Sequence, residues 1–256
     1  MNKPGIDWHA RAIQVAFLAG VIALWYLVGA TGKINTVFLP ELPRVIEKFG
    51  QIVQTSRLYE NLRVTLTELV AAFAIASTLG LTVGYFVGRS RYAALVFEPL
   101  LAGLFAIPLI VFLPLFILFF GIGMESKIAF GASYAFFPIA LNTIGGISQV
   151  DPRFVTVARS MGANDAQLFR RVLLPAALPV IVTGLRMGCI IAFLSILGSE
   201  MIAGLRGLGS RVAALAEGMN TAEMFAYIVF VIFLAMILNV RLSNAQRRFG
   251  ETRRAA

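Results

Sequence analysis

Ionisable side chains stand within or beside long apolar stretches of this sequence. Glu68 and Arg186 fall well inside such stretches, and Glu98 and Glu200 fall near their ends. A charged group that faces lipid is costly, so such side chains turn inward, pair with one another or stand on the pathway of a solute. Structural pairing and solute contact both remain open for the two deeper residues. Hydration at a membrane surface is a further explanation for Glu98 and Glu200.

Uncharged polar residues and prolines extend this set. Asn142, Ser195 and Ser199 can hydrogen-bond between helices or line a solute path. Pro108 and Pro114 are expected to bend the apolar stretch that contains them, which would leave room for a cavity. The candidate path residues are therefore Glu68, Pro108, Asn142, Arg186, Ser195, Ser199 and Glu200.

Catalytic and metal chemistry find little support in the sequence. The chain has one histidine, His9, and one cysteine, Cys189. Neither a disulfide framework nor a matched nucleophile and base can be built from them. The GxxxxGK[ST] phosphate loop is also missing, so ATP hydrolysis is not expected in this chain. The sequence predicts no catalytic residue and no metal ligand.

The composition is that of a membrane protein. Of 256 residues, 59% are hydrophobic and only 14% are charged, and the mean hydropathy is +0.83. Soluble domains carry about 25% charged residues. Several apolar stretches of membrane-spanning length would leave too little polar chain to cover them in water.

Six stretches are long enough to cross the hydrocarbon core as helices, and helices are required because nothing in lipid pairs an open strand edge. We therefore predict an all-α polytopic membrane protein in which residues 1–256 form a single domain. The predicted spans are 12–31, 65–88, 100–120, 127–148, 180–199 and 222–240.

An even number of spans places both termini on the same side of the membrane. If that side is the cytoplasm, it carries more Lys and Arg than the other side. Its basic residues include Lys3, Arg89, Arg171 and Arg253, and those on the outer side include Lys33. The bias follows the positive-inside rule. The net charge of +9 is spread over loops, which favours orientation and lipid contact over nucleic-acid binding.

Two segments on the predicted outer side have patterns of their own. Residues 41–54 repeat apolar side chains at helical spacing and carry Pro43 in the first turn, which predicts an amphipathic helix at the membrane surface. Residues 204–221 are too polar to span and too apolar for a free loop. Their glycines predict a turn and then a short helix, in a re-entrant or surface-lying segment.

Residues 151–178 predict a helix, a glycine corner and a second helix on the cytoplasmic side. Asp151 and Pro152 form a helix start, and the helix is expected to stop at Gly162. Asn164 and Gln167 have capping-box spacing, so a second helix begins there. Pro175 and Pro179 are expected to punctuate the chain before span five. On physical grounds alone, an amphipathic connector is the alternative.

This segment resembles a signature of the inner-membrane permeases of bacterial binding-protein-dependent ABC importers. That signature is Glu-Ala-Ala, three residues, Gly, nine residues, Ile, one residue, Leu-Pro. The chain has Thr156-Val157-Ala158, Gly162, Val172 and Leu174-Pro175 at the same spacing. Thr156 replaces the acidic residue, which puts one polar contact with a partner in doubt. FLPELPRV, FFPIALNTIGGI, GLRMG and SEMIAG resemble the branch that imports nitrate, taurine and other sulfonates.

The resemblance implies the type I importer architecture and a set of partners. Two permease copies, a homodimer here, would pair in the bacterial inner membrane with two cytoplasmic ATPases, which bind ATP and Mg, and an extracytoplasmic binding protein would deliver a small anionic solute. No cofactor is expected in this chain itself. The implied ATPase-coupling residues are Thr156, Ala158, Arg159, Gly162, Ala163, Asn164, Asp165, Gln167, Leu168, Leu174 and Pro175.

A secondary transporter or a channel-like protein without an ATPase is the alternative function. Secondary transporters use clusters of intramembrane acids or repeated broken helices. The sequence has no pairwise acid cluster and no convincing similarity between its halves. A membrane anchor would explain the spans but not the capped cytoplasmic segment.

Overall fold

The structure is a computed structural model that describes residues 8–31, 35–36 and 38–251. Within these residues the chain forms helices and no strands, which confirms the all-α prediction. Lys3, Lys33 and Arg253, which enter the charge bias, lie outside the described residues.

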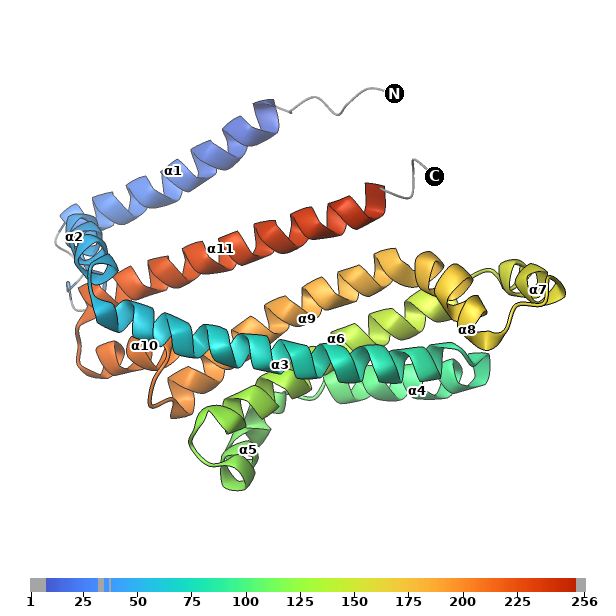
Figure 1. The fold of residues 1–256 in the computed structure, drawn as a ribbon. Coiled ribbons are helices and arrows are strands. Elements are labelled where there is room, and N and C mark those ends of the chain that lie inside the picture. Colours follow the sequence, from blue (N-terminus) through green and yellow to red (C-terminus); the bar gives the residue numbers. More distant parts are fainter. Residues whose placement is uncertain (1–7, 32–34, 37, 252–256) are drawn as a thin grey trace.

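Three long helices form the centre of the bundle: α3 (Ser56–Gly88), α6 (Met124–Ser148) and α9 (Leu174–Ala203) (Figure 1). Glycines allow their backbones to approach closely. A Cβ at Gly84 of α3 would lie 2.5 Å from Cβ of Thr143 in α6, and one at Gly188 of α9 would lie 2.5 Å from Cγ1 of Ile139. Small residues at such crossings are typical of membrane bundles, where association depends on close packing.

Helices of membrane-spanning length and composition agree with the predicted spans. Five described helices qualify, and a bent helix pair would make a sixth. Besides the central three, they include α1 (Trp8–Ala30) and α11 (Thr221–Glu251). Several extend beyond the predicted bounds, because polar ends such as residues 56–64 continue the same helix beyond its apolar stretch.

The third span, predicted as one stretch over 100–120, is broken. It consists of α4 (Arg91–Phe105), a 3-10 turn η1 (Leu109–Phe112) and α5 (Leu113–Phe120), and its two halves are bent by 72°. Pro108 disfavours the helical conformation at the residue before it and lacks a backbone donor, and Pro114 begins the next helix. The predicted bend is confirmed. Because α4 begins at Arg91, Glu98 lies in mid-helix and exposed, not at a span end.

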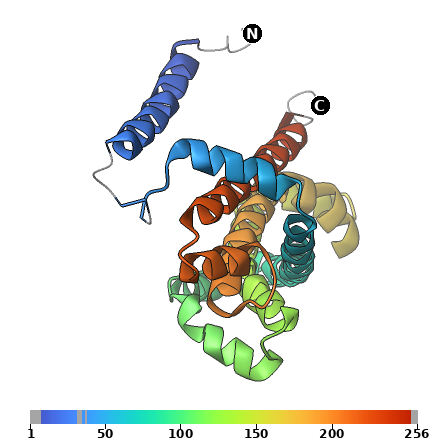
Figure 2. The same ribbon diagram turned by 90° about the vertical axis from the view of Figure 1, so that its left-hand side faces the viewer.

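The bundle has two distinct ends. The helix α2 (Leu42–Val53) confirms the predicted amphipathic helix, and it packs on α11. The short helix α10 (Leu208–Glu217) follows the glycine turn and packs against α3, α9 and α11. Figures 1 and 2 place α2 and α10 at one end, and Figure 1 places α7 (Pro152–Ser160) and α8 (Asp165–Leu168) at the other, toward which the start of α1 and the end of α11 also point.

The helix α1 is held to the bundle mainly near its end. Trp25 Nε1 donates a hydrogen bond of 3.1 Å to the carbonyl of Pro40, and its ring lies 5.4 Å from that of Phe225 in α11. Most described side chains of α1 are exposed in the isolated chain. Lipid or a second protein copy must cover this apolar helix.

Candidate functional site

The predicted cytoplasmic segment folds as the sequence indicates. The Asp151 carboxylate accepts a 2.9 Å hydrogen bond from the backbone N–H of Arg153, and Pro152 occupies the first turn of α7. The Thr156 hydroxyl, at the position where the signature has an acid, donates to the carbonyl of Pro152 at 3.1 Å and is exposed. The side chain at position 156 therefore contacts its own helix within this chain.

The corner between α7 and α8 is a Schellman motif. The N–H of Gly162 bonds to the carbonyl of Arg159, and the N–H of Ala163 bonds to the carbonyl of Ala158. Gly162 has φ +79°, a left-handed conformation that glycine adopts without steric cost. A Cβ at position 162 would meet no atom within 4 Å. The backbone conformation, rather than lack of space, is what requires glycine.

The capping box after the corner is complete. Asn164 Oδ1 accepts from the N–H of Gln167 at 2.8 Å, and Gln167 Oε1 accepts from the N–H of Asn164 at 3.0 Å. Arg159 and Asp165 form an ion pair across the corner. Because both side chains are largely exposed, this pair adds little stability and mainly fixes the shape of the corner.

The second cytoplasmic helix does not end at the prolines. The helix α8 continues through a π-helical turn, η2 (Phe169–Leu173), directly into α9, which contains Pro175 and Pro179. The expectation that these prolines interrupt the chain was wrong. Pro175 has no backbone donor and its ring crowds the preceding turn, and the wider π turn just before it leaves room for that ring. The helix α8 thus continues without a break into the membrane helix α9.

Two residues on this segment face the bundle instead of a partner. Leu168 is buried, and the Phe169 ring meets that of Tyr85 in α3 edge-on at 4.4 Å. Leu174 packs beside the buried Ala177 and Ile181. Leu168 and Leu174 therefore hold the segment in place. Behind it lies a cavity of about 770 Å³ between α7 and the ends of α3 and α6, lined by residues that include Arg89, Thr156 and Arg159.

An exposed apolar row on α7 was missed by sequence reasoning. Phe154, Val157 and Met161 are 62%, 58% and 82% exposed. Their spacing of three and four residues places them on one helix face. That spacing was the signal in the sequence that could have identified them as a contact surface.

One candidate path residue, Glu200, is the centre of a hydrogen-bonded cluster with Thr65, Leu208 and Gly209, which we call the Glu200 network. Glu200 Oε1 accepts from the Thr65 hydroxyl at 2.7 Å, and Oε2 accepts from the N–H of Gly209 at 2.7 Å. The Thr65 oxygen in turn accepts from the N–H of Leu208 at 2.9 Å. All these groups are buried, so the network ties α3, α9 and α10 together.

Glu68 lies beside this network without joining it. Its side chain is fully buried, and neither carboxyl oxygen has a hydrogen-bond partner among the described residues. Lys127 of α6 is also buried and donates to the carbonyls of Ile122 and Gly123 at 3.0 and 2.9 Å.

The remaining candidate path residues lie apart from this cluster. Arg186 donates to Gln246 Oε1 at 3.0 Å and to Asn239 Oδ1 at 2.9 Å, both from α11. Asn142 donates to a carbonyl of its own helix, as do Ser195 and Ser199. Ser195 also lines a mainly apolar cavity of about 300 Å³ beside Phe105 and Tyr134. The structure thus places Glu68 beside the Glu200 network without a hydrogen bond to it, keeps Ser199 next to Glu200 in α9, and leaves Pro108, Asn142, Arg186 and Ser195 elsewhere in the chain.

Sequence comparison gives consistent relatives. A family model described as "binding-protein-dependent transport system inner membrane component" matches residues 76–254. The taurine transport system permease protein TauC of Escherichia coli is 32% identical over 92% of this chain and 88% of its own. The putative aliphatic sulfonates transport permease protein SsuC of Bacillus subtilis is 31% identical over 89% and 83%.

Solved structures agree with the fold. A chain of the inward-facing MetNI methionine ABC transporter matches 76% of this chain and 97% of its own with a TM-score of 0.67 at 21% identity. A chain of an amino acid ABC transporter matches 79% and 97% with a TM-score of 0.60. The resemblance drawn from residues 156–175 is thereby confirmed. This chain belongs to the inner membrane components of binding-protein-dependent transport systems, and it is the permease subunit, not the ATPase, of an ABC importer.

Proposed function

We propose that this permease imports small organosulfonates. The support comes from the taurine and sulfonate permeases TauC and SsuC, which are 32% and 31% identical to this chain over most of its length. A riboflavin permease, RibX of Chloroflexus aurantiacus, is 29% identical, so membership of the family does not by itself fix the solute. Four arginines, Arg57, Arg63, Arg206 and Arg211, line a pocket at the α10 end of the bundle. Their charge favours an anionic group on the solute.

We propose further that α7 and α8 dock on the ATPase. The single observation that carries this role is the exposed apolar row Phe154, Val157 and Met161 on α7 and its C-cap, next to α8, which continues through η2 into α9. An apolar helix face of this kind fits a groove on a partner protein. Closure of two ATPases would then rock the membrane helices.

The orientation follows from this role. If α7 and α8 meet a cytoplasmic ATPase, both termini are cytoplasmic and α2 and α10 face the binding protein. Reporter fusions at Glu41, Arg91, Ile122, Arg159, Arg211 and Arg247 should alternate out, in, out, in, out, in. An extracytoplasmic reporter at Arg159 would overturn both the orientation and the docking role.

Uptake measurements test the substrate. Deleting the gene in its native host should abolish uptake of radiolabelled taurine or ethanesulfonate, and a plasmid copy should restore it. Riboflavin uptake serves as the control for a relative with a different solute. Unchanged sulfonate uptake in the deletion strain, with loss of another solute, would replace the substrate and leave the permease assignment intact.

A further inference from the structure

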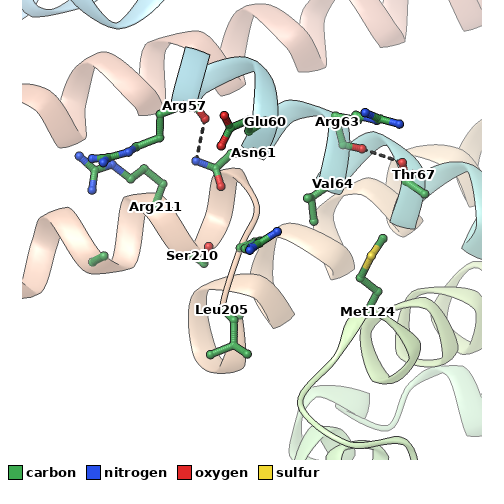
Figure 3. Close-up of a pocket in the computed structure, with 13 residues that line it drawn as sticks. Arg57, Glu60, Asn61, Arg63, Val64, Thr67, Met124, Leu205, Ser210 and Arg211 are labelled. Carbon is green, nitrogen blue, oxygen red and sulfur yellow. Dashed lines mark hydrogen bonds between the residues drawn. The ribbon is translucent and has the colours of Figure 1, made fainter. Parts of the chain in front are cut away.

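A polar pocket opens at the α10 end of the bundle, away from α7 and α8. Its volume is about 700 Å³. The first turns of α3, the loop 204–206, α10 and the start of α6 supply its walls (Figure 3). The lining residues are Arg57, Glu60, Asn61, Arg63, Val64, Thr67, Met124, Gly204, Leu205, Arg206, Ser210, Arg211 and Ala214.

The charge of this pocket is strongly positive. Its lining holds four arginines and one carboxylate, Glu60. Arg211 is paired with Glu223 at 2.7 Å. The guanidinium groups of Arg57, Arg63 and Arg206 have no ion pair within the described part of the chain. A cleft lined by one sign of charge concentrates ions of the opposite sign.

The hydroxyl donors of the pocket are used inside the protein, and so is one of the two N–H donors of the Asn61 amide. Asn61 donates to the carbonyl of Arg57 at 3.0 Å, Thr67 donates to that of Arg63 at 2.7 Å, and Ser210 donates to that of Gly207 at 2.9 Å. Most of the side-chain donors left for a ligand are therefore guanidinium N–H groups. These groups fit oxyanions such as sulfonates and phosphates through paired hydrogen bonds.

The loop that carries Arg206 is fixed in place. The N–H of Gly207 donates to Asn61 Oδ1 at 3.0 Å, and Gly207 has φ +115°. The Glu200 network holds the residues that follow. Figure 3 shows Arg57 and Arg211 extending to one side of the pocket and Arg63 to the other. Because the backbone is already ordered, anion binding would cost little further loss of freedom.

We propose that this pocket is an anion-binding site that receives the solute on its way into the permease. The sulfonate as its ligand rests on the proposed function, whereas the anion chemistry rests on the arginines alone. A phospholipid headgroup offers the same chemistry, since its phosphate also suits guanidinium groups. The experiment must therefore separate solute from lipid.

Charge-selective labelling of an introduced thiol tests the site directly. Ala214 lines the pocket and is exposed, so Ala214→Cys places a thiol in it, while the native Cys189 is buried. The purified importer, in nanodiscs of zwitterionic lipid, is treated with sulfonatoethyl or with trimethylammonioethyl methanethiosulfonate. Intact-mass spectrometry of this chain gives each labelling rate, free of any cysteine on the partners.

A thiol outside the pocket on the same helix is the matched control. Ala216→Cys is exposed on α10 but does not line the pocket. The ratio of anionic to cationic labelling rates should be about tenfold higher at position 214 than at 216. Adding Arg57→Gln and Arg206→Gln together should reduce the ratio at 214 to that at 216. Equal ratios at both positions in the unsubstituted background would overturn the proposal.

Protection of the introduced thiol from labelling by a bound anion distinguishes a binding site from a general positive field. At constant ionic strength set with choline chloride, ethanesulfonate should slow labelling at position 214 with a saturable dependence, and choline chloride alone sets the baseline. Absence of protection by any anion would overturn the site. If Ala214→Cys and Ser210→Cys both stay unreactive, the pocket is closed to solutes and the proposal also fails.

Two further measurements test whether a lipid headgroup occupies the pocket and whether its arginines dock the binding protein. If nanodiscs containing phosphatidylglycerol suppress both labelling and protection, the headgroup is the occupant and the solute role is wrong. If the paired arginine substitutions weaken only the affinity for the binding protein, leaving the labelling ratio unchanged, the arginines form a docking surface instead. Labelling requires no transport, so a failed uptake test of the proposed function leaves this result independent.

Discussion

Glu200 illustrates how one buried carboxylate organises three helices. Both of its oxygens accept hydrogen bonds, one from Thr65 of α3 and one from Gly209 of α10. In Glu200→Gln, the amide NH₂ would face a donor, leaving a buried group unsatisfied at a cost of about 1–3 kcal/mol. We expect a lower apparent melting temperature of the purified protein, measured by tryptophan fluorescence.

Glu68→Gln is the matched control at the same place. Glu68 is equally buried but gives up no hydrogen bond on substitution. A buried carboxylate without partners is itself costly, so the uncharged amide should leave the melting temperature unchanged or raise it. Equal losses for both substitutions would contradict the role assigned to the Glu200 network and would indicate a general intolerance of change in this cluster.

At the scale of elements, the corner between α7 and α8 depends on Gly162. Its left-handed backbone costs about 1–2 kcal/mol for a residue with a Cβ, although the chain itself leaves space for a side chain. Gly162→Trp should therefore insert into the membrane at normal yield but lose copurification with the ATPase, and uptake with it.

Asparagine separates backbone conformation from bulk at this corner. It tolerates the left-handed region better than other residues with a Cβ, so Gly162→Asn should retain more ATPase association than Gly162→Trp. If Gly162→Trp copurified with its ATPase and supported normal uptake, α7 and α8 would be a connector without a coupling role.

Helix packing gives an independent prediction within α9. A Cβ at Gly188 would lie 2.5 Å from Ile139 of α6, whereas one at Gly198 would meet nothing within 4 Å. Gly188→Ala should overpack this crossing and cost about 1–3 kcal/mol, and Gly198→Ala should be neutral. The yield of monodisperse protein in detergent, with the melting temperature, measures the difference. A neutral Gly188→Ala would mean that the helices can shift apart at this crossing.

The sequence predicted the elements that depend on local rules. Apolar length predicted the spans, and Asp151, Gly162 and Asn164 predicted the corner through capping and backbone preference. It did not predict the π turn at Phe169–Leu173, because a proline in the sequence predicts the end of a helix even where the helix can widen around it.

Features made by distant residues could not be predicted from local rules. Thr65 and Glu200 are 135 residues apart, and only the packing of α3 on α9 brings them together. Glu98 was placed at a span end because the polar start of α4 was not counted as helix. The residues predicted to couple to the ATPase included Leu168, which packs inward. They did not include Phe154, whose exposure depends on which side of α7 faces the bundle.

At the scale of the whole molecule, a single copy does not present an assembled solute path. The predicted path residues lie in separate places, and most of them bond within the chain. The cavity beside Ser195 has a mainly apolar lining that includes Phe105 of α4. The helix α1 leaves most of its described side chains exposed. A second permease surface would cover these regions and enclose a path between the two copies.

A homodimer is therefore the expected assembly, because closed twofold symmetry lets one surface cover its own equivalent. Two copies with different affinity tags, coexpressed with the ATPase, should copurify through either tag, and crosslinking should yield a dimer of this chain. As a control, copies expressed separately and mixed after solubilisation should not exchange tags within the assay. Recovery of only one tag from an intact ATPase complex would exclude the homodimer and point to a heterodimer with a related permease, whose own surface would then complete the path.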